Sequence, residues 1–275
     1  MTREFLFAQL AAHFLADFVC QSDAMVKAKR ARGSARLLGF LRHGLVHLFW
    51  SAVLPPGRWT NPVLLAAAAV VLAHLAIDLV RSGLERRHGS PRNAFWFFLL
   101  DQTLHLAFIL AAAWSLGLVL AEPPIDPSCL RSFKAFAGDL AKMPERTKVL
   151  SALVVTLAGT WGVGVGIRLY FQGRLRGEEG GVPAGSVPCG PADGTGAREG
   201  GFAIGLLERL IIMLSLLLRQ EALIGFLLAV KSIARFKKFD NDCFIEYFII
   251  GSSLSFLAAI IAGWLLRGLL LAQWM

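Results

Sequence analysis

The strongest constraint on the fold of this chain is a series of apolar stretches, each long enough to cross a bilayer. A helix needs about 20 apolar residues to span the hydrocarbon core. Charged residues make up only 17% of the sequence, against about 25% in soluble proteins, and they gather between these stretches. We therefore predict an all-α, polytopic membrane protein with seven or eight transmembrane helices. The stretches are 3–20, 37–54, 62–81, 94–120, 149–171, 202–218, 220–235 and 243–271.

The basic residues predict how the chain is oriented. Lys27, Lys29 and Arg30 follow the first stretch, and Arg81 and its neighbours follow the third. The turn that joins the second stretch to the third has only Arg58. Cytoplasmic loops of membrane proteins carry the excess of Lys and Arg. We therefore expect a bacterial cytoplasmic (inner) membrane, with the N-terminus outside. The net charge of +9 then reflects topology, and we expect the lipid bilayer, not nucleic acid, as the partner.

The apolar stretches and the composition between them divide the chain into four parts. Residues 1–121 are predicted to form an N-terminal four-helix membrane bundle. Residues 122–172 supply an external connection and a fifth membrane helix, in which the GVGVG run at 162–166 favours close helix packing. Residues 173–200 are rich in Gly and Pro, which predicts a flexible cytoplasmic linker. Residues 201–275 form a C-terminal helical membrane unit.

Histidine and aspartate recur inside the first four stretches at one spacing. Each pair is separated by four residues, which places both side chains on the same face of a helix, one turn apart. Each pair also lies roughly seven to ten residues from a basic residue at the expected cytoplasmic end. This is a depth of about 10–15 Å at 1.5 Å per residue. The pairs are His13 and Asp17, His43 and His47, His74 and Asp78, and Asp101 and His105.

Eight such side chains at one depth predict a metal centre. Ionisable groups inside a bilayer are expensive and usually face the bundle interior with a partner or a function. Imidazole and carboxylate ligands suit Zn, Fe or Mn, and the number of donors is enough for two divalent ions. Gln21 and Gln102 flank the pairs and could orient ligands or substrate. The alternative is that His–Asp and His–His hydrogen bonds hold the helices together without a metal.

A second polar set lies in the C-terminal unit. Glu208 and Arg209 are adjacent in one stretch, Lys231 and Arg235 end the next, and Glu246 begins the last. One interpretation is a buried network in which Glu208 and Glu246 pair with the basic residues. The other is that Arg209, Lys231 and Arg235 hold an anionic headgroup or substrate, for which the arginine fork is suited.

The paired motifs resemble a family of bacterial membrane proteins known as the domain of unknown function 3307. The matching patterns are H-x3-ADF-x2-Q at 13–21, H-x3-H at 43–47, H-x2-ID at 74–78 and DQ-x2-H at 101–105. This resemblance covers about residues 1–120, and segments within 202–258 resemble the C-terminal extension of longer members. The resemblance supports the membrane architecture and implies no particular activity.

Three classes of function remain open from the sequence. The first is a metal-dependent membrane hydrolase that acts on a lipid-like or phosphoester substrate from the cytoplasmic side. The second is a divalent-metal transporter or sensor, although donors at a single depth and the lack of an inverted repeat disfavour a transport path. The third is a structural membrane protein that uses the His/Asp pairs only for packing.

Overall fold

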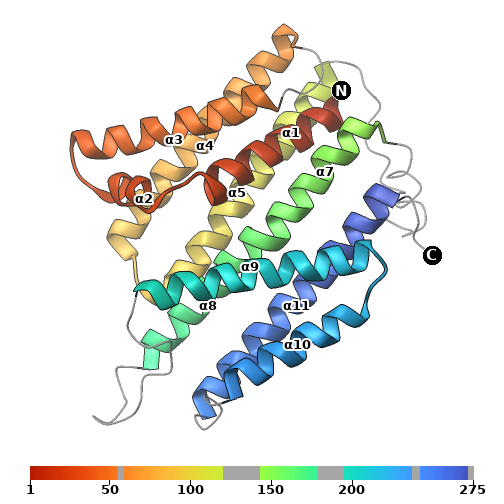
Figure 1. Ribbon diagram of the computed structural model, residues 1–275. Helices are drawn as coiled ribbons and strands as arrows, with labels where there is room; N and C mark the ends of the chain where they lie inside the picture. The colour runs from red at the N-terminus through yellow and green to blue at the C-terminus, as the bar shows by residue number, and fades with distance from the viewer. Residues whose placement is uncertain (55–58, 120–142, 179–194, 237–241, 272–275) are drawn as a thin grey trace.

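The computed structural model describes residues 1–54, 59–119, 143–178, 195–236 and 242–271, and every regular element in these ranges is a helix (Figure 1). The all-α prediction is therefore confirmed for this part of the chain. The elements are α1 (Thr2–Phe14), η1 (Leu15–Val19), α2 (Asp23–Arg30), α3 (Ser34–Val53), α4 (Asn61–His88), α5 (Pro91–Val119), α7 (Glu145–Leu157), η3 (Ala158–Gly162), α8 (Val163–Glu178), α9 (Thr195–Leu217), α10 (Ala222–Arg235) and α11 (Asp242–Leu271).

The first helix ends in a π turn, and the chain then bends sharply. The axis of Thr2–Val19 meets that of α2 at 89°. Ser22 has an extended backbone and begins α2, because its hydroxyl accepts a hydrogen bond from the main-chain N–H of Met25 (3.3 Å). The short helix α2 then packs against α3 and α4. The bend returns the chain to the bundle at the end where α4 finishes (Figure 1).

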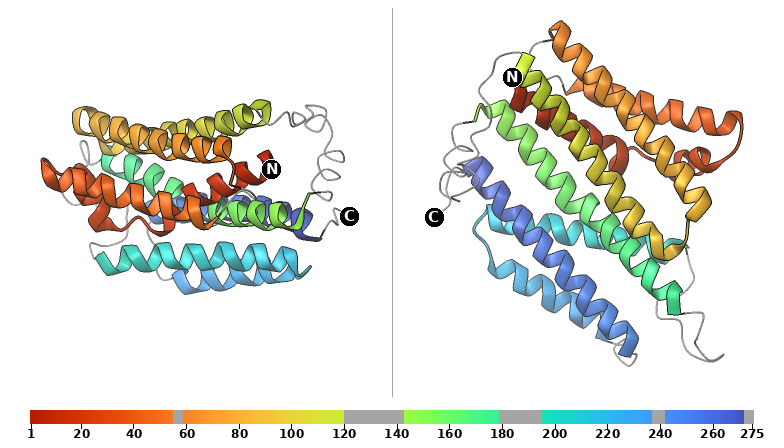
Figure 2. Two further views of the ribbon diagram at one scale, coloured as in Figure 1. Left: turned by 90° about the horizontal axis from the view of Figure 1, so that it is seen from above. Right: turned by 180° about the vertical axis from the view of Figure 1, so that it is seen from behind.

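The continuous helix α7–η3–α8 joins the two halves of the molecule. It packs against α1 and α5 on one side and against α11 on the other. Figure 2 shows α4 and α5 along one face of the molecule and α9 and α10 along the opposite face, with α7 between them. Gly164 makes the close approach expected of the GVGVG run, because a Cβ there would lie 2.9 Å from the Phe202 ring of α9.

Several helices are long and apolar enough to cross a membrane. Five satisfy that test in the described part of the chain, and a sixth is added if the bent pair Thr2–Val19 and α2 forms one span. Among the eight predicted stretches, α3 falls short because Arg36, Arg42, His43 and His47 lower the hydropathy of its 20 residues, and α10 has only 14 residues. The five are Asn61–His88, Asn93–Val119, Glu145–Gln172, Gly200–Leu217 and Phe248–Leu271.

The distribution of polarity is that of a protein surrounded by lipid. Large apolar side chains such as Leu65 and Ile233 are more than 70% exposed, whereas all five histidines of the paired motifs are buried. In water, this arrangement would expose apolar surface and bury the most polar groups. In a bilayer, the exposed apolar side chains face lipid and the ionisable side chains are kept away from it.

Two predicted connections lie largely outside the described residues. The structure does not describe residues 122–142 of the external connection at 122–148, or residues 179–194 of the Gly/Pro-rich linker at 173–200. The helices run into the predicted linker at both ends, because α8 continues to Glu178 and α9 begins at Thr195.

Candidate metal centre

The four helices of the paired motifs bring all eight predicted side chains into one cluster. His13 comes from α1, Asp17 from η1, and the remaining pairs from α3, α4 and α5. A π turn is a frequent device at functional sites because it re-aims one side chain, and here it carries Asp17. His43 and His47 have no exposed surface. We call these eight residues the His/Asp cluster.

His74 occupies the middle of the His/Asp cluster. Its Nε2 lies 2.7 Å from His43 Nε2, and its Nδ1 lies 3.3 Å from His13 Nδ1. The ring centroids of His47 and His105 are 4.3 Å and 4.4 Å from that of His74. Imidazoles from all four helices therefore converge on one side chain.

The carboxylates enter the same space from the side of α2. Asp17 Oδ1 lies 3.2 Å from His43 Nε2 and 3.3 Å from His74 Nε2, and Asp78 Oδ2 lies 3.2 Å from His43 Nε2. Two ligand atoms that are each about 2.0–2.1 Å from one tetrahedral ion are about 3.3 Å apart. The two distances from Asp17 Oδ1 are therefore close to those of a ligand set, whereas the 2.7 Å between His43 Nε2 and His74 Nε2 is a hydrogen-bond distance.

Three overlapping groups in the cluster have the donor geometry for an ion. Within each group, the ligand atoms all lie within 4.8 Å of one another. His74 and His105 each belong to two groups, so the arrangement suits two neighbouring ions that share ligands. The groups are His13, His74 and His105; Asp17, His43 and His74; and Asp78, Asp101 and His105.

Side-chain and main-chain polar groups other than the imidazoles contact one ring nitrogen of each surrounding histidine. His13 Nε2–H donates to Gln102 Oε1 (3.2 Å), and His105 Nδ1–H donates to the main-chain oxygen of Asp101 (2.8 Å). The Ser51 hydroxyl lies 3.4 Å from His47 Nδ1, and the Gln21 amide lies 3.4 Å from His43 Nδ1. Histidine ligands are commonly oriented in this way by a partner on the nitrogen away from the metal.

Two buried polar atoms of the cluster that lack hydrogen-bond partners in the described part of the chain also suit a site for a divalent ion. His47 Nε2 and Asp101 Oδ1 are buried and have no hydrogen-bond partner among the described residues. A buried polar atom without a partner is destabilising by about 1–3 kcal/mol. A cation bound at Asp101 would remove that penalty at its Oδ1, whereas His47 belongs to none of the three candidate ligand groups.

Two basic side chains at the edge of the cluster were not predicted as site residues. Lys29 Nζ of α2 lies 2.5 Å from Asp78 Oδ2, and Arg81 Nη1 of α4 lies 2.8 Å from Asp101 Oδ2. Both had been interpreted only as determinants of membrane topology. Arg81 follows Asp78 by three residues on the same helix face, which is a usable signal. The position of Lys29 depends on the bend before α2, and no local pattern indicates it.

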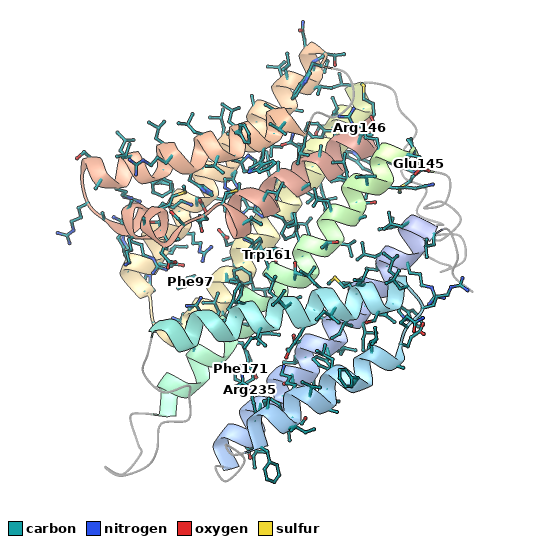
Figure 3. All side chains as sticks on the ribbon, viewed as in Figure 1. Phe97, Glu145, Arg146, Trp161, Phe171 and Arg235 are labelled. Atoms are coloured by element: carbon teal, nitrogen blue, oxygen red, sulfur yellow. The ribbon has the colours of Figure 1, made fainter. Side chains whose placement is uncertain are left out.

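The predicted C-terminal residues lie away from the His/Asp cluster. Lys231 Nζ forms an ion pair with Glu208 Oε2 at 2.6 Å, and Arg209 Nη1 donates to Ser255 Oγ at 3.0 Å. The Arg235 guanidinium stacks over the Phe248 ring, among α9, α10 and α11 (Figure 3). Glu246 was expected in the same buried network, but its side chain is exposed on α11. Gln21 and Gln102 are thus the only flanking residues of the prediction that the described structure brings to the cluster.

The described part of the chain is all-helical, and several of its helices are long and apolar enough to cross a membrane. The bundle also contains the buried His/Asp cluster. Residues 5–123 match the model of the family described as "Protein of unknown function (DUF3307)". The match confirms the resemblance over the part of the chain that contains the whole His/Asp cluster. No match was found among curated proteins or among solved structures.

Proposed function

We propose that this protein is a metal-dependent membrane hydrolase whose His/Asp cluster binds one or two divalent ions, with Zn preferred over Fe or Mn. The observation that carries the proposal is the orientation of the imidazoles. His13 donates its Nε2–H to Gln102, which leaves its Nδ1 3.3 Å from His74 Nδ1. His105 donates its Nδ1–H to the main-chain oxygen of Asp101, which leaves its Nε2 3.4 Å from the main-chain oxygen of His74. Simple helix packing would require neither this common orientation nor five imidazoles around one point.

Hydrolysis suits the arrangement better than transport does. An apolar core closes the bundle on one side of the cluster, with Phe5 and Leu10 of α1, Val70 of α4 and Ile109 of α5 among its members. On the other side, a cavity reaches Asp17 and Asp78. A transport site should connect to both faces, whereas a hydrolytic site needs access from one. This difference favours an enzyme over a transporter.

The cluster has the parts needed for hydrolysis of an ester or phosphoester. A bound divalent ion would supply Lewis-acid polarisation of a phosphoryl or carbonyl oxygen. A carboxylate of the cluster that is not used as a ligand could hold a proton. We propose a lipid-like or phosphoester substrate that arrives from the cytoplasmic side, because Lys29, Arg30 and Arg81 surround the open side of the cluster.

Elemental analysis of the purified protein tests the metal centre. We expect one or two Zn, Fe or Mn ions per chain, and loss of that metal in a His43→Ala/His74→Ala double variant. His88→Ala is the matched control, because His88 is exposed at the end of α4. Protein that is free of metal and also fails to bind added zinc would contradict the proposal. Metal that is present in the wild type and lost in the double variant would justify a screen of phosphoester and lipid substrates.

A further inference from the structure

A small cavity lies beside the His/Asp cluster, between the bent helix α2 and the end of α4. Its volume is about 60 Å³, enough for a small group such as a few water molecules. Asp17 and Asp78 of the cluster form part of its wall, and Lys29, Arg30 and Arg81 form another part. The cavity therefore joins the proposed metal ligands to three cations.

The cations at this cavity pair with carboxylates that the proposed metal would also use. Lys29 contacts Asp78, and Arg81 contacts Asp101. Both Asp78 and Asp101 belong to one of the candidate ligand groups. A divalent ion on these carboxylates would compete with the ammonium and guanidinium groups for the same oxygens. The Lys29 ammonium and the Arg81 Nη1–H donor would then be free to bind an anion, while Arg81 Nε stays paired with Glu85 at 2.9 Å.

The charge around the cavity gives the class of that anion. The wall contains three basic residues, Lys29, Arg30 and Arg81, and three acidic residues, Asp17, Asp78 and Glu85, so it is neutral without a metal. One divalent ion would leave a charge of about +2. A phosphate monoester has a charge of about −1.5 to −2 at neutral pH. A carboxylic ester has none.

We propose that this cavity binds the phosphoryl group of the substrate, with Lys29 and Arg81 holding its oxygens next to the metal. The inference rests on the proposed function and narrows its substrate to phosphoesters. Arg81 can offer a two-pronged donor to phosphate oxygens, and Lys29 a point charge. The Gln21 side chain, which also lines the cavity, can donate a further hydrogen bond. Either a lipid headgroup or a water-soluble phosphoester has the required chemistry.

Calorimetric titration with inorganic phosphate tests this site on the intact, zinc-saturated protein. We expect binding to the wild type, and a loss of about tenfold or more in Lys29→Met and in Arg81→Met, since a hydrogen bond to a charged group contributes about 1.5–3 kcal/mol. Lys27→Met and Arg87→Met are matched controls, because both residues are exposed on the same two helices. Lys29→Arg keeps the positive charge and should keep most of the binding.

The possible outcomes separate this inference from the proposed function. Zinc content is measured on every sample, so a chain that binds no zinc contradicts the metal centre itself. A zinc-loaded chain that binds no phosphate, or binds it equally well in Lys29→Met and Arg81→Met, contradicts only the phosphoryl site. Competition by a short-chain phosphatidic acid, stronger than that by glycerol phosphate, would identify a lipid headgroup. Equal competition would identify a water-soluble phosphoester.

Discussion

At the scale of single residues, the cluster depends on side chains that orient its imidazoles as well as on the imidazoles. Gln102 accepts from His13 Nε2, and its own amide donates to Asp101 Oδ2 at 3.0 Å. One residue thus fixes a proposed ligand on α1 and another on α5. Its place next to Asp101 in the sequence made it a candidate for this role, and the structure shows both contacts.

Replacing Gln102 tests this orienting role. Gln102→Leu removes the acceptor of the His13 N–H and the donor to Asp101 while keeping a side chain of similar size. Loss of such an outer partner typically weakens metal binding by about 10–100-fold, and we expect that range for zinc, measured by competition with a chromogenic chelator. Thr103→Ala is the control, because Thr103 is exposed and bonds only to its own helix at Leu99. Equal zinc affinity in both variants would limit Gln102 to a packing role.

At the scale of helices, small residues decide how closely the fifth helix meets the C-terminal unit. The π turn η3 contains Gly159, where an added Cβ would lie 2.5 Å from Met213 Cε of α9 and 2.7 Å from Ala262 Cβ of α11. Met213 can change its conformation, but the Cβ of Ala262 moves only with its helix. Three helices therefore approach one another closely at a position that only glycine fits.

Enlarging this glycine should separate the helices. We expect Gly159→Ala to lower the free energy of unfolding by about 1–3 kcal/mol, the usual range for overpacking a tight core. The thermal midpoint of the protein in detergent measures the change. Gly166→Ala, on the same continuous helix, is the control, because its Cβ would lie 3.6 Å from the Phe98 ring, an ordinary contact distance. Equal midpoints for the two variants would contradict the close approach at η3.

The helix pair α9–α10 depends on the ion pair between Glu208 and Lys231. Both side chains are largely buried, and the Lys231 ammonium also lies 5.3 Å from the centre of the Phe256 ring. Arg235 and Lys231 therefore contact protein groups within the C-terminal unit, far along the chain from the His/Asp cluster. These contacts favour the structural interpretation of the C-terminal polar set over the headgroup interpretation.

Breaking this ion pair should affect stability and leave the metal centre intact. Lys231→Met leaves the Glu208 carboxylate buried without its partner, a change that typically destabilises by about 3–5 kcal/mol. The double variant Glu208→Gln/Lys231→Met removes both charges and should recover most of that loss. Zinc content and phosphate binding are expected to stay at the wild-type level in the double variant. If phosphate binding disappears there, the C-terminal unit takes part in substrate binding.

At the scale of the whole molecule, local sequence patterns were enough to predict the donors of the cluster, but they could not predict every contact between segments that are distant in the sequence. The eight donors of the cluster could be named because each pair shares a helix face and because all four pairs have the same depth. Lys29 could not be placed, because it reaches Asp78 only through the bend between Val19 and Asp23, which no apolar periodicity indicates. Glu246 was misplaced because depth along a helix does not specify which face turns inward.

The ends of the helices gather at two opposite ends of the molecule, and the number of membrane crossings stays a prediction. The beginning of α1 and the end of α11 lie toward the same end of the molecule, whereas α2 and the end of α4 lie toward the other (Figure 1). Eight helical segments occupy the eight predicted stretches in the described part of the chain, but five of them, or six with the bent pair, are long and apolar enough to cross a membrane. The predicted number of seven or eight is therefore not confirmed.

Cysteine labelling in oriented vesicles tests this topology and the side from which the cluster is reached. Starting from a variant without its four native cysteines, Ser90→Cys places a thiol in the exposed turn between α4 and α5, and Asn61→Cys places one at the exposed start of α4. The excess of Arg and Lys near Ser90 predicts that this end is cytoplasmic. An impermeant maleimide should therefore label Ser90→Cys only in inside-out vesicles and Asn61→Cys only in right-side-out vesicles. The reverse pattern would place the cavity of Lys29 and Arg81 on the outer face, and the substrate would then have to come from outside the cell.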